Sequence, residues 1–269
     1  MKKILLPTDF SENAENAIAY AQQLFEKEAC MFFILHAYHG VPSAPTNKKD
    51  MESNLHESIK ALRAKNKNKE HGFEGIILTD SVVNAINITF IDKGIDFVVI
   101  GTQGSSALRE VVLGSNTVSV IKYMERCPVI VVPTEYKFHI PKKVVFATDY
   151  KHTFAMHELH PLIAFSKLWL SKITIAHIAV KAVLTGTQTA NKEILNKSLG
   201  EIEHDFLNLE KETSLAETLL SLERGDRQIG LVAMMRTKHG IFQTLFREPV
   251  IKKMAFQSKI PFLVLALLK

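Results

Sequence analysis

The sequence contains two cysteines among 269 residues, Cys30 and Cys127, and no Cys-x-x-Cys pair. Two cysteines in different predicted elements supply neither a disulfide framework nor a zinc-ligand set, so we expect both to be buried, reduced thiols. Long apolar runs are also absent: none reaches the ~18 residues needed to cross a bilayer, and the first run breaks at Pro7, too early for a signal peptide. We therefore expect a cytoplasmic protein that does not engage a membrane.

Two common nucleotide-binding fingerprints are missing as well. No Gly-Lys-Ser/Thr follows the glycines of the loop at 101–117, and the first predicted strand ends in Leu-Pro-Thr-Asp instead of Gly-x-Gly-x-x-Gly. The charged residues of that loop are Arg109 and Glu110, whereas a hydrolase or kinase needs a general base, a metal-holding carboxylate pair or a lysine. Enzymatic activity is therefore disfavoured, and a slow hydrolysis is the most that these residues predict.

Charge and histidine patterns do not indicate nucleic-acid or metal binding. The formal charge is +5, and much of the excess lies at 48–70, where lysines alternate with acidic residues and no aromatic residues interleave to stack bases. This pattern predicts a solvated helix face. His36 and His39, and likewise His157 and His160, are three residues apart, but no cysteine or carboxylate pair completes a ligand set. We therefore expect no bound metal and no nucleic-acid partner.

The chain is an internal repeat. Lys2–Phe10, KKILLPTDF, recurs as Lys142–Tyr150, KKVVFATDY. Ile34–Ala37 is answered by Ile175–Ile178, and Cys127–Pro133 by Ile260–Ala266, in the same order and at similar shifts. Two homologous domains follow, 1–137 and 138–269, joined by a linker near 136–141.

Each half alternates short apolar runs with helical patterns. In the first half the runs are unalternated and rich in Val, Ile, Leu and Phe, as in strands buried on both faces, and the alternation of strands and helices predicts a parallel sheet with helical crossovers in each half. Predicted strands are 3–7, 31–37, 74–79, 95–100, 128–132, 143–148, 172–178, 204–210, 229–235 and 261–267. Predicted helices are 11–27, 49–70, 80–93, 115–125, 154–170, 188–203, 213–224 and 248–257. Pro161 is expected to kink its helix unless it lies in the first turn. The expected fold is α/β, with two tandem open parallel five-stranded sheets flanked by helices in Rossmann-like three-layer α/β/α domains.

A glycine-spaced loop follows the fourth predicted strand. Gly101 and Gly104 allow a close turn of the backbone, and Gly114 precedes Ser115-Asn116, which open a helix with unpaired N–H groups. Such a helix end attracts phosphate, so the loop predicts a nucleotide cradle. Plainer roles remain open at this point: turn glycines, a helix cap at Ser115, and a cap for the following helix at Asp9.

With these motifs in this order, the chain resembles the universal stress protein family in its tandem two-domain form, over its whole length. The resemblance rests on Leu6-Pro7-Thr8-Asp9, Leu35-His36-Ala37, the glycine-spaced loop and Cys127–Pro133. The resemblance implies that the chain binds an adenine nucleotide and has a role in stress resistance. ATP is the expected nucleotide, and the choice between ATP, ADP and AMP and the presence of Mg²⁺ are left open. The site it implies comprises Pro7, Thr8 and Asp9 near the adenosine, Ala37 along the adenine by its backbone, and Gly101, Gly104, Gly114, Ser115 and Asn116 around ribose and phosphates. Arg109 either reaches a terminal phosphate or is a solvated surface residue.

The second half departs from this pattern. Alignment places Met235 and Lys238 opposite Gly101 and Gly104, and Glu248-Pro249 opposite Gly114-Ser115. A carboxylate repels phosphate, and proline removes a backbone donor, so we expect one nucleotide per chain, in the N-terminal domain.

Three functions follow as hypotheses: a regulatory nucleotide-binding module, a nucleotide-free scaffold that acts by protein contacts, and a slow ATP hydrolase. An apolar terminal strand is an aggregation hazard unless it is covered, so we expect 128–132 and 261–267 to pair within the chain. A homodimer and the identity of a protein partner are left open.

Overall fold

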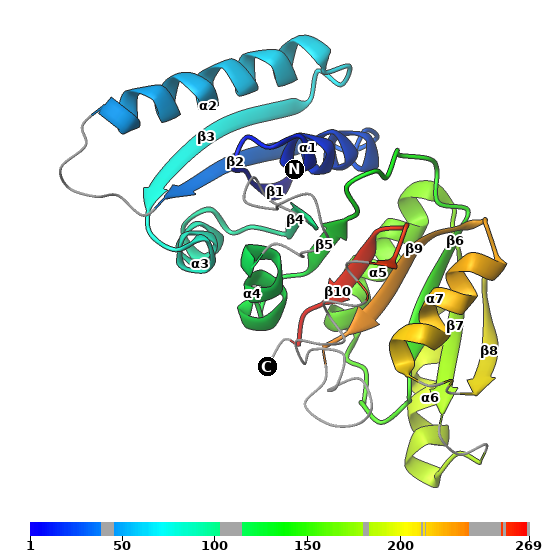
Figure 1. The fold of residues 1–269 in the computed structure, drawn as a ribbon. Coiled ribbons are helices and arrows are strands. Elements are labelled where there is room, and N and C mark those ends of the chain that lie inside the picture. Colours follow the sequence, from blue (N-terminus) through cyan, green and yellow to red (C-terminus); the bar gives the residue numbers. More distant parts are fainter. Residues whose placement is uncertain are drawn as a thin grey trace. The chain divides into compact units, whose positions relative to one another are not determined.

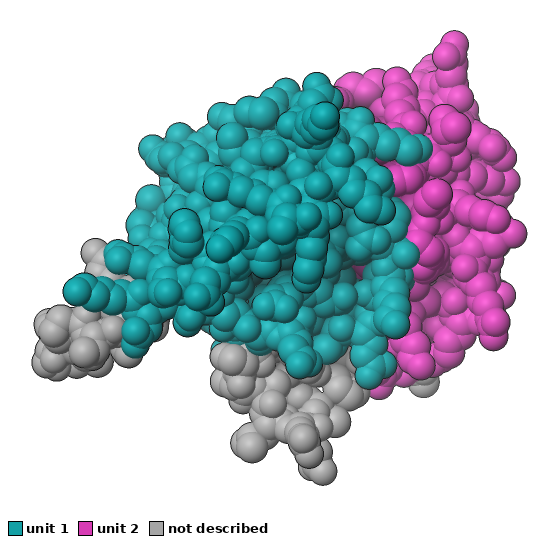
Figure 2. All heavy atoms as spheres, turned by 90° about the horizontal axis from the view of Figure 1, so that it is seen from above, with its two compact units in different colours: residues 1–138 teal, residues 139–269 magenta. Residues whose placement is uncertain are grey.

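The computed structural model describes residues 1–38, 46–102, 115–179, 183–210, 212, 214–236, 254 and 257–267. The chain divides into two compact units, Met1–Phe138 and His139–Lys269 (Figure 2). Cys30 and Cys127 are buried, unpaired thiols, as expected, and burial raises the pKa of Cys30 to about 12. Within the described ranges, no helix combines the length and apolar character needed to span a membrane.

The first unit is a parallel sheet with the strand order β3-β2-β1-β4-β5 (Figure 1). Its strands are β1 (Lys2–Pro7), β2 (Cys30–Tyr38), β3 (His71–Thr79), β4 (Phe97–Gly101) and β5 (Val129–Val132). The helices between them are α1 (Glu12–Leu24), α2 (Thr46–Lys65), α3 (Val82–Lys93) and α4 (Ser115–Tyr123). The chain runs outward from β1 to β3 and then returns to β4 on the other side of β1. The strand order therefore switches between β1 and β4.

The second unit repeats this topology with the order β10-β9-β6-β7-β8 (Figure 1). Its strands are β6 (Lys143–Thr148), β7 (Lys172–Ala179), β8 (His204–Glu210), β9 (Ile229–Met235) and β10 (Phe262–Leu265). Its helices are α5 (Met156–Trp169), α6 (Gly186–Leu199) and α7 (Leu215–Gly225). The predicted fold class is confirmed. Most of the predicted helix at 248–257 lies outside the described residues.

The central strands form the core of each unit, as the unalternated apolar runs predict. Ile4, Leu5 and Leu6 of β1 are fully buried, and all seven residues of β9 are buried. Two-sided burial was expected of β3 and is wrong, because Phe73 is its single buried residue. Strand β8, at the corresponding place in the second unit, has no buried residue.

Helix α5 contains Pro161 beyond its first turn, five residues after its first residue Met156. Its start is also unusual, because Ala155 occupies the N-cap position and has no side-chain acceptor. Glu158 compensates: its carboxylate accepts hydrogen bonds from the Ala155 N–H, at 2.9 Å, and the His152 ring, at 2.8 Å. A carboxylate in the first turn also interacts favourably with the helix dipole.

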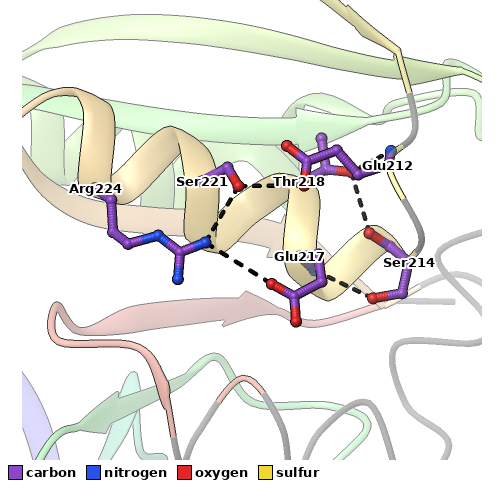
Figure 3. Close-up of polar contacts among 6 residues, drawn as sticks. All are labelled: Glu212, Ser214, Glu217, Thr218, Ser221 and Arg224. Atoms are coloured by element: carbon purple, nitrogen blue, oxygen red, sulfur yellow. Dashed lines mark hydrogen bonds and ion pairs between the residues drawn. The ribbon is translucent and has the colours of Figure 1, made fainter.

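Helix α7 begins at a serine cap within a small polar network (Figure 3). The Ser214 hydroxyl accepts the Glu217 N–H at 3.2 Å, which satisfies one of the unpaired donors at the helix start. Thr218 ties the preceding segment to this turn, because its hydroxyl accepts the Glu212 N–H at 3.0 Å. Further along, Ser221 donates to Glu212 at 3.2 Å and accepts from Arg224 at 3.2 Å.

Candidate functional site

The residues predicted to bind a ligand gather at the carboxyl ends of β1, β2 and β4 in the first unit (Figure 1). Open parallel sheets bind ligands at this edge, next to the switch in strand order. Pro7 ends β1, Ala37 lies near the end of β2, and Gly101 ends β4. Ser115 and Asn116 are the exposed first residues of α4. Gly104, Arg109 and Gly114 lie outside the described residues.

The turn after β1 is held by its own polar side chains. The Thr8 N–H donates to the Leu35 carbonyl at 2.8 Å, and the Thr8 hydroxyl accepts the Phe10 N–H at 3.0 Å. Phe10 has a φ of 62°, a left-handed conformation that is uncommon for a bulky residue. The loop therefore has a specified, strained shape at the edge where the candidate site lies.

Asp9 supports the cap of α1 but does not occupy the N-cap position itself. Its Oδ1 accepts the Ser11 N–H at 3.1 Å and the Ser11 hydroxyl at 2.6 Å. Ser11 is the N-cap residue, and its hydroxyl accepts the Ala14 N–H at 3.3 Å. One oxygen of the Asp9 carboxylate is thus used to orient the cap.

His36 belongs to the same cluster, although it was not among the residues predicted to bind the nucleotide. Its Nδ1 lies 2.9 Å from the Thr8 carbonyl oxygen, and because a carbonyl only accepts, Nδ1 donates in this bond. The His36 ring also stacks on Phe10, with centroids 4.6 Å apart. The recurrence of histidine at His177 was the signal that could have identified it.

The backbone of Ala37 faces the space beyond the end of β1. The β1–β2 ladder ends at the pair Pro7–Leu35, and the Leu35 carbonyl points toward β1, where Thr8 donates to it. Backbone polar groups alternate in direction along a strand, so those of Ala37 point to the same side as those of Leu35, beyond the last residue of β1. A ligand at this edge can therefore form hydrogen bonds with the Ala37 backbone.

Gly101 also has a packing role, because it lies where α1 approaches β4. A Cβ atom there would lie 2.4 Å from the Asn13 side-chain nitrogen and 3.0 Å from the Asn13 carbonyl oxygen. The missing side chain therefore lets α1 approach β4. Helix α4 is anchored at the same point, because the buried Thr117 hydroxyl donates to the Gly101 carbonyl at 2.7 Å.

The second unit reproduces the turn after the first strand in detail. The Tyr150 N–H donates to the Thr148 hydroxyl at 3.0 Å, and Asp149 Oδ1 accepts the Lys151 N–H at 3.1 Å. Tyr150 has a φ of 54°, and its ring stacks on His177 with centroids 4.7 Å apart. The repeat is thus preserved at the level of single hydrogen bonds.

In the second unit, residues of α6 cover the turn after β6. Gln188 donates its side-chain amide to the Asp149 carbonyl at 2.8 Å, and Asn191 donates to the Tyr150 carbonyl at 2.8 Å. Tyr150 is fully buried, and burial raises its pKa well above the usual value. The sheet register also places buried Met235 where the first unit has Gly101. Lys238, Glu248 and Pro249 lie outside the described residues.

Metal-ligating side chains do not cluster in the described part of the chain. There, His, Cys, Asp and Glu form no group of three or more that could hold a metal ion.

Strand order, buried parallel strands and a switch-point cluster define an open α/β protein of the Rossmann-like type. The model of the universal stress protein family matches residues 1–133. The universal stress protein MJ0577 of Methanocaldococcus jannaschii is 32% identical over 154 residues, which cover 49% of this chain and 94% of that protein. The chain therefore belongs to the universal stress protein family, and its length is consistent with the tandem form.

Several solved structures, of which two are described here, are similar to the chain over nearly its full length. A universal stress protein from Archaeoglobus fulgidus has a TM-score of 0.72 at 17% identity, covering 98% of this chain and 96% of that one. The cytoplasmic domain of a prokaryotic cation chloride cotransporter has a TM-score of 0.58 at 9% identity, covering 98% and 95%. At these identities the similarity shows a shared fold.

Proposed function

We propose that this chain is a cytoplasmic regulatory protein of the stress response that binds one adenine nucleotide, ATP in the first instance, in its N-terminal domain. The nucleotide-binding domain is 1–137, and 138–269 is a degenerate copy. The observation that carries the proposal is the contrast between two otherwise matching turns. After β6 the turn is fully buried and bonded to α6, whereas Asp9 and Phe10 in the turn after β1 are partly exposed.

The contacts proposed for the nucleotide follow from this geometry. Adenine lies along the backbone of Ala37, and the adenosine lies near Pro7, Thr8 and Asp9. Ser115 and Asn116 open α4, whose unpaired N–H groups attract phosphate at this edge of the sheet. Gly104, Gly114 and Arg109 complete the proposed phosphate site. Gly101 contributes by allowing α1 and β4 to pack closely.

The experiment that tests the proposal is calorimetric titration of the full chain with ATP, with and without Mg²⁺. We expect saturable binding near one nucleotide per chain. Gly114→Glu, which copies Glu248 from the second half, should abolish it. Asp9→Asn should weaken binding, and the matched change Asp149→Asn should leave it unchanged. Competition with ADP and AMP ranks the three nucleotides.

Two results would redirect the proposal. If nucleotide-free wild-type chain binds no adenine nucleotide, the scaffold function that acts by protein contacts becomes the better hypothesis. If phosphate release is measurable and disappears in Gly114→Glu, the site is a slow ATP hydrolase, since a contaminating enzyme would not respond to that change.

A further inference from the structure

A histidine at the start of β3 connects two turns at the amino ends of the strands in the first unit. His71 is the first residue of β3 and is partly exposed. Its Nε2 lies 3.2 Å from the carbonyl oxygens of both Phe25 and Glu28, in the segment between α1 and β2. Its Nδ1 lies 2.9 Å from Oδ1 of Asn66, in the segment between α2 and β3. The proposed nucleotide site lies at the carboxyl ends of the strands, so these contacts are separate from it.

The atoms opposite both ring nitrogens of His71 are hydrogen-bond acceptors. The two carbonyl oxygens opposite Nε2 can only accept, so this nitrogen needs a proton to bond them. The Asn66 amide is oriented by a second bond, because its Nδ2 donates to the Asn68 carbonyl at 2.6 Å. Turning the amide over would place two oxygen acceptors against each other, so Oδ1 is the atom that faces His71. Nδ1 must therefore donate as well.

This set of partners selects the charged form of the ring. Only the imidazolium donates from both nitrogens, whereas a neutral histidine has one donor and one acceptor. A neutral ring at this position would turn a nitrogen lone pair either toward Asn66 or toward the two carbonyl oxygens. One of the two contacts would then be repulsive, and the doubly protonated ring avoids this.

The end of α1 favours a cation at the same place. Helix C-termini carry unpaired carbonyl groups and a partial negative charge, which a nearby histidinium stabilises. Phe25, whose carbonyl faces Nε2, is the C-cap residue of α1, and the last turn of this helix contains no basic residue. The corresponding helix of the second unit, α5, has Lys167 in its own last turn. His71 therefore supplies from β3 the cation that α1 lacks.

The other ionisable groups near His71 influence it less than its direct partners do. Cys30, its neighbour in the β2–β3 register, is a buried thiol, and the Glu28 carboxylate lies 3.7 Å from Lys2 Nζ. The remaining ionisable side chains on the adjoining segments are exposed, and solvent and salt screen such charges. They are of both signs: Glu26, Lys27, Arg63, Lys65, Lys67, Lys69 and Glu70.

The second unit provides a comparison at the corresponding position. His204 is the first residue of β8, and its Nδ1 lies 2.6 Å from the Ile202 carbonyl oxygen. Its Nε2 lies 2.9 Å from Oδ1 of Asn196. In the described part of the chain no second hydrogen bond fixes the Asn196 amide, so this amide can turn and donate to Nε2. A neutral His204 with its proton on Nδ1 then satisfies both partners.

We propose that His71 is a proton-binding clasp, which at neutral pH is an imidazolium that holds the turn after α1 to the start of β3. An unfolded histidine loses its second proton near about pH 6.5. The contribution of the clasp to stability is therefore complete below that pH, and it is lost as the pH rises through the higher value at which folded His71 releases its proton. The first unit is thus held together less tightly in alkaline solution.

The direct test is NMR spectroscopy of the imidazole nitrogens in the isotope-labelled full chain at about pH 7.5, where an unfolded histidine is mostly neutral. His71, assigned by the loss of its signals in His71→Gln, should carry protons on both ring nitrogens, and His204 on one. Asn66→Ala removes the acceptor opposite Nδ1 and should convert His71 to a ring with a single N–H. An unprotonated ring nitrogen on His71 in the wild-type chain overturns the proposal.

A second test compares the melting temperatures of wild type and His71→Gln between about pH 7 and pH 9. Wild type should melt above the variant at the lower pH, and the difference should shrink toward the higher pH, because all other ionisable groups are common to both chains. The matched change His204→Gln should give a difference that is constant over this range. A constant difference for His71→Gln as well would contradict the proposed clasp.

Discussion

At Gly101, the absence of one methyl group determines how closely α1 approaches β4. A Cβ atom would overlap the Asn13 side chain and press on its backbone carbonyl, so Gly101→Ala must displace the helix or the strand end. We expect a loss of about 1–3 kcal/mol in the free energy of unfolding, the usual cost of overpacking. Urea denaturation monitored by circular dichroism measures it.

Gly186 provides the control for this prediction. It begins α6, and a Cβ atom there would meet nothing within 4 Å. Gly186→Ala should therefore leave the free energy of unfolding unchanged or raise it slightly, by up to ~1 kcal/mol. Equal losses in the two variants would contradict the packing explanation.

Glu223 makes the stability of the chain depend on pH. Burial raises the pKa of its carboxyl, although hydrogen bonds from the Lys259 N–H, at 2.5 Å, and the Ser258 hydroxyl, at 2.9 Å, act in the opposite direction. Because the folded-state pKa is above the ordinary value of 4.5, this carboxyl contributes fully below that value. The contribution is lost as the pH rises through the raised pKa.

Glu223→Gln tests this sign. Glutamine keeps an acceptor for Lys259 and can donate to Ser258, which leaves the Ser258 proton for the Ile260 carbonyl that already accepts it at 2.8 Å. We expect the variant to melt above wild type at pH 7 and close to it at pH 4. A variant that melts below wild type at pH 7 would show that the ionised carboxylate is stabilising.

At the scale of elements, the serine cap of α7 should be worth about 1 kcal/mol. Ser214→Ala removes the acceptor for the Glu217 N–H and should lower the free energy of unfolding by roughly that amount. Ser221→Ala is the matched control in the same helix, since it loses two exposed hydrogen bonds and no cap (Figure 3). The control should change stability by less than ~0.5 kcal/mol. Chemical denaturation of both variants provides the comparison.

Element positions were predictable where one local signal decides them. The bounds predicted for β6 and β9 match the observed ones, because their apolar runs are buried on both faces and end sharply. Side-chain caps similarly indicate where α1 and α7 begin, whereas Ala155 offers no such signal and Glu158 replaces it from inside α5. The exposure of β3 depends on its place at the edge, which no local pattern encodes.

The candidate site was predictable in position more than in detail. Asp9, Ala37 and Gly101 were expected at strand ends, and topology brings those ends to one edge of the sheet. The contact of Gly101 with Asn13 was not foreseen, because it joins residues far apart in the sequence. Gln188 and Asn191 were missed for the same reason: their partners are about 40 residues away along the chain.

At the scale of the whole molecule, the proposed nucleotide should protect one unit and not the other. A ligand at 100 times its Kd stabilises the state that binds it by about 2.7 kcal/mol. Hydrogen exchange with saturating ATP should therefore slow in peptides from 1–138, most of all in those containing the turn after β1 and the start of α4. Equal protection in 139–269 would contradict a single site per chain.

Two side-chain amides of α6, those of Gln188 and Asn191, donate hydrogen bonds to the turn after β6, and this affects the expected shape of the nucleotide-binding curve. They bind the carbonyl groups of Asp149 and Tyr150 in that turn, so we expect that the second unit does not compete with the first for nucleotide. Within one chain, saturation should then follow a simple hyperbola, without the sigmoid shape that two coupled sites could give. A chain with the single site proposed here should therefore respond to nucleotide concentration in a graded way, although its fold is duplicated.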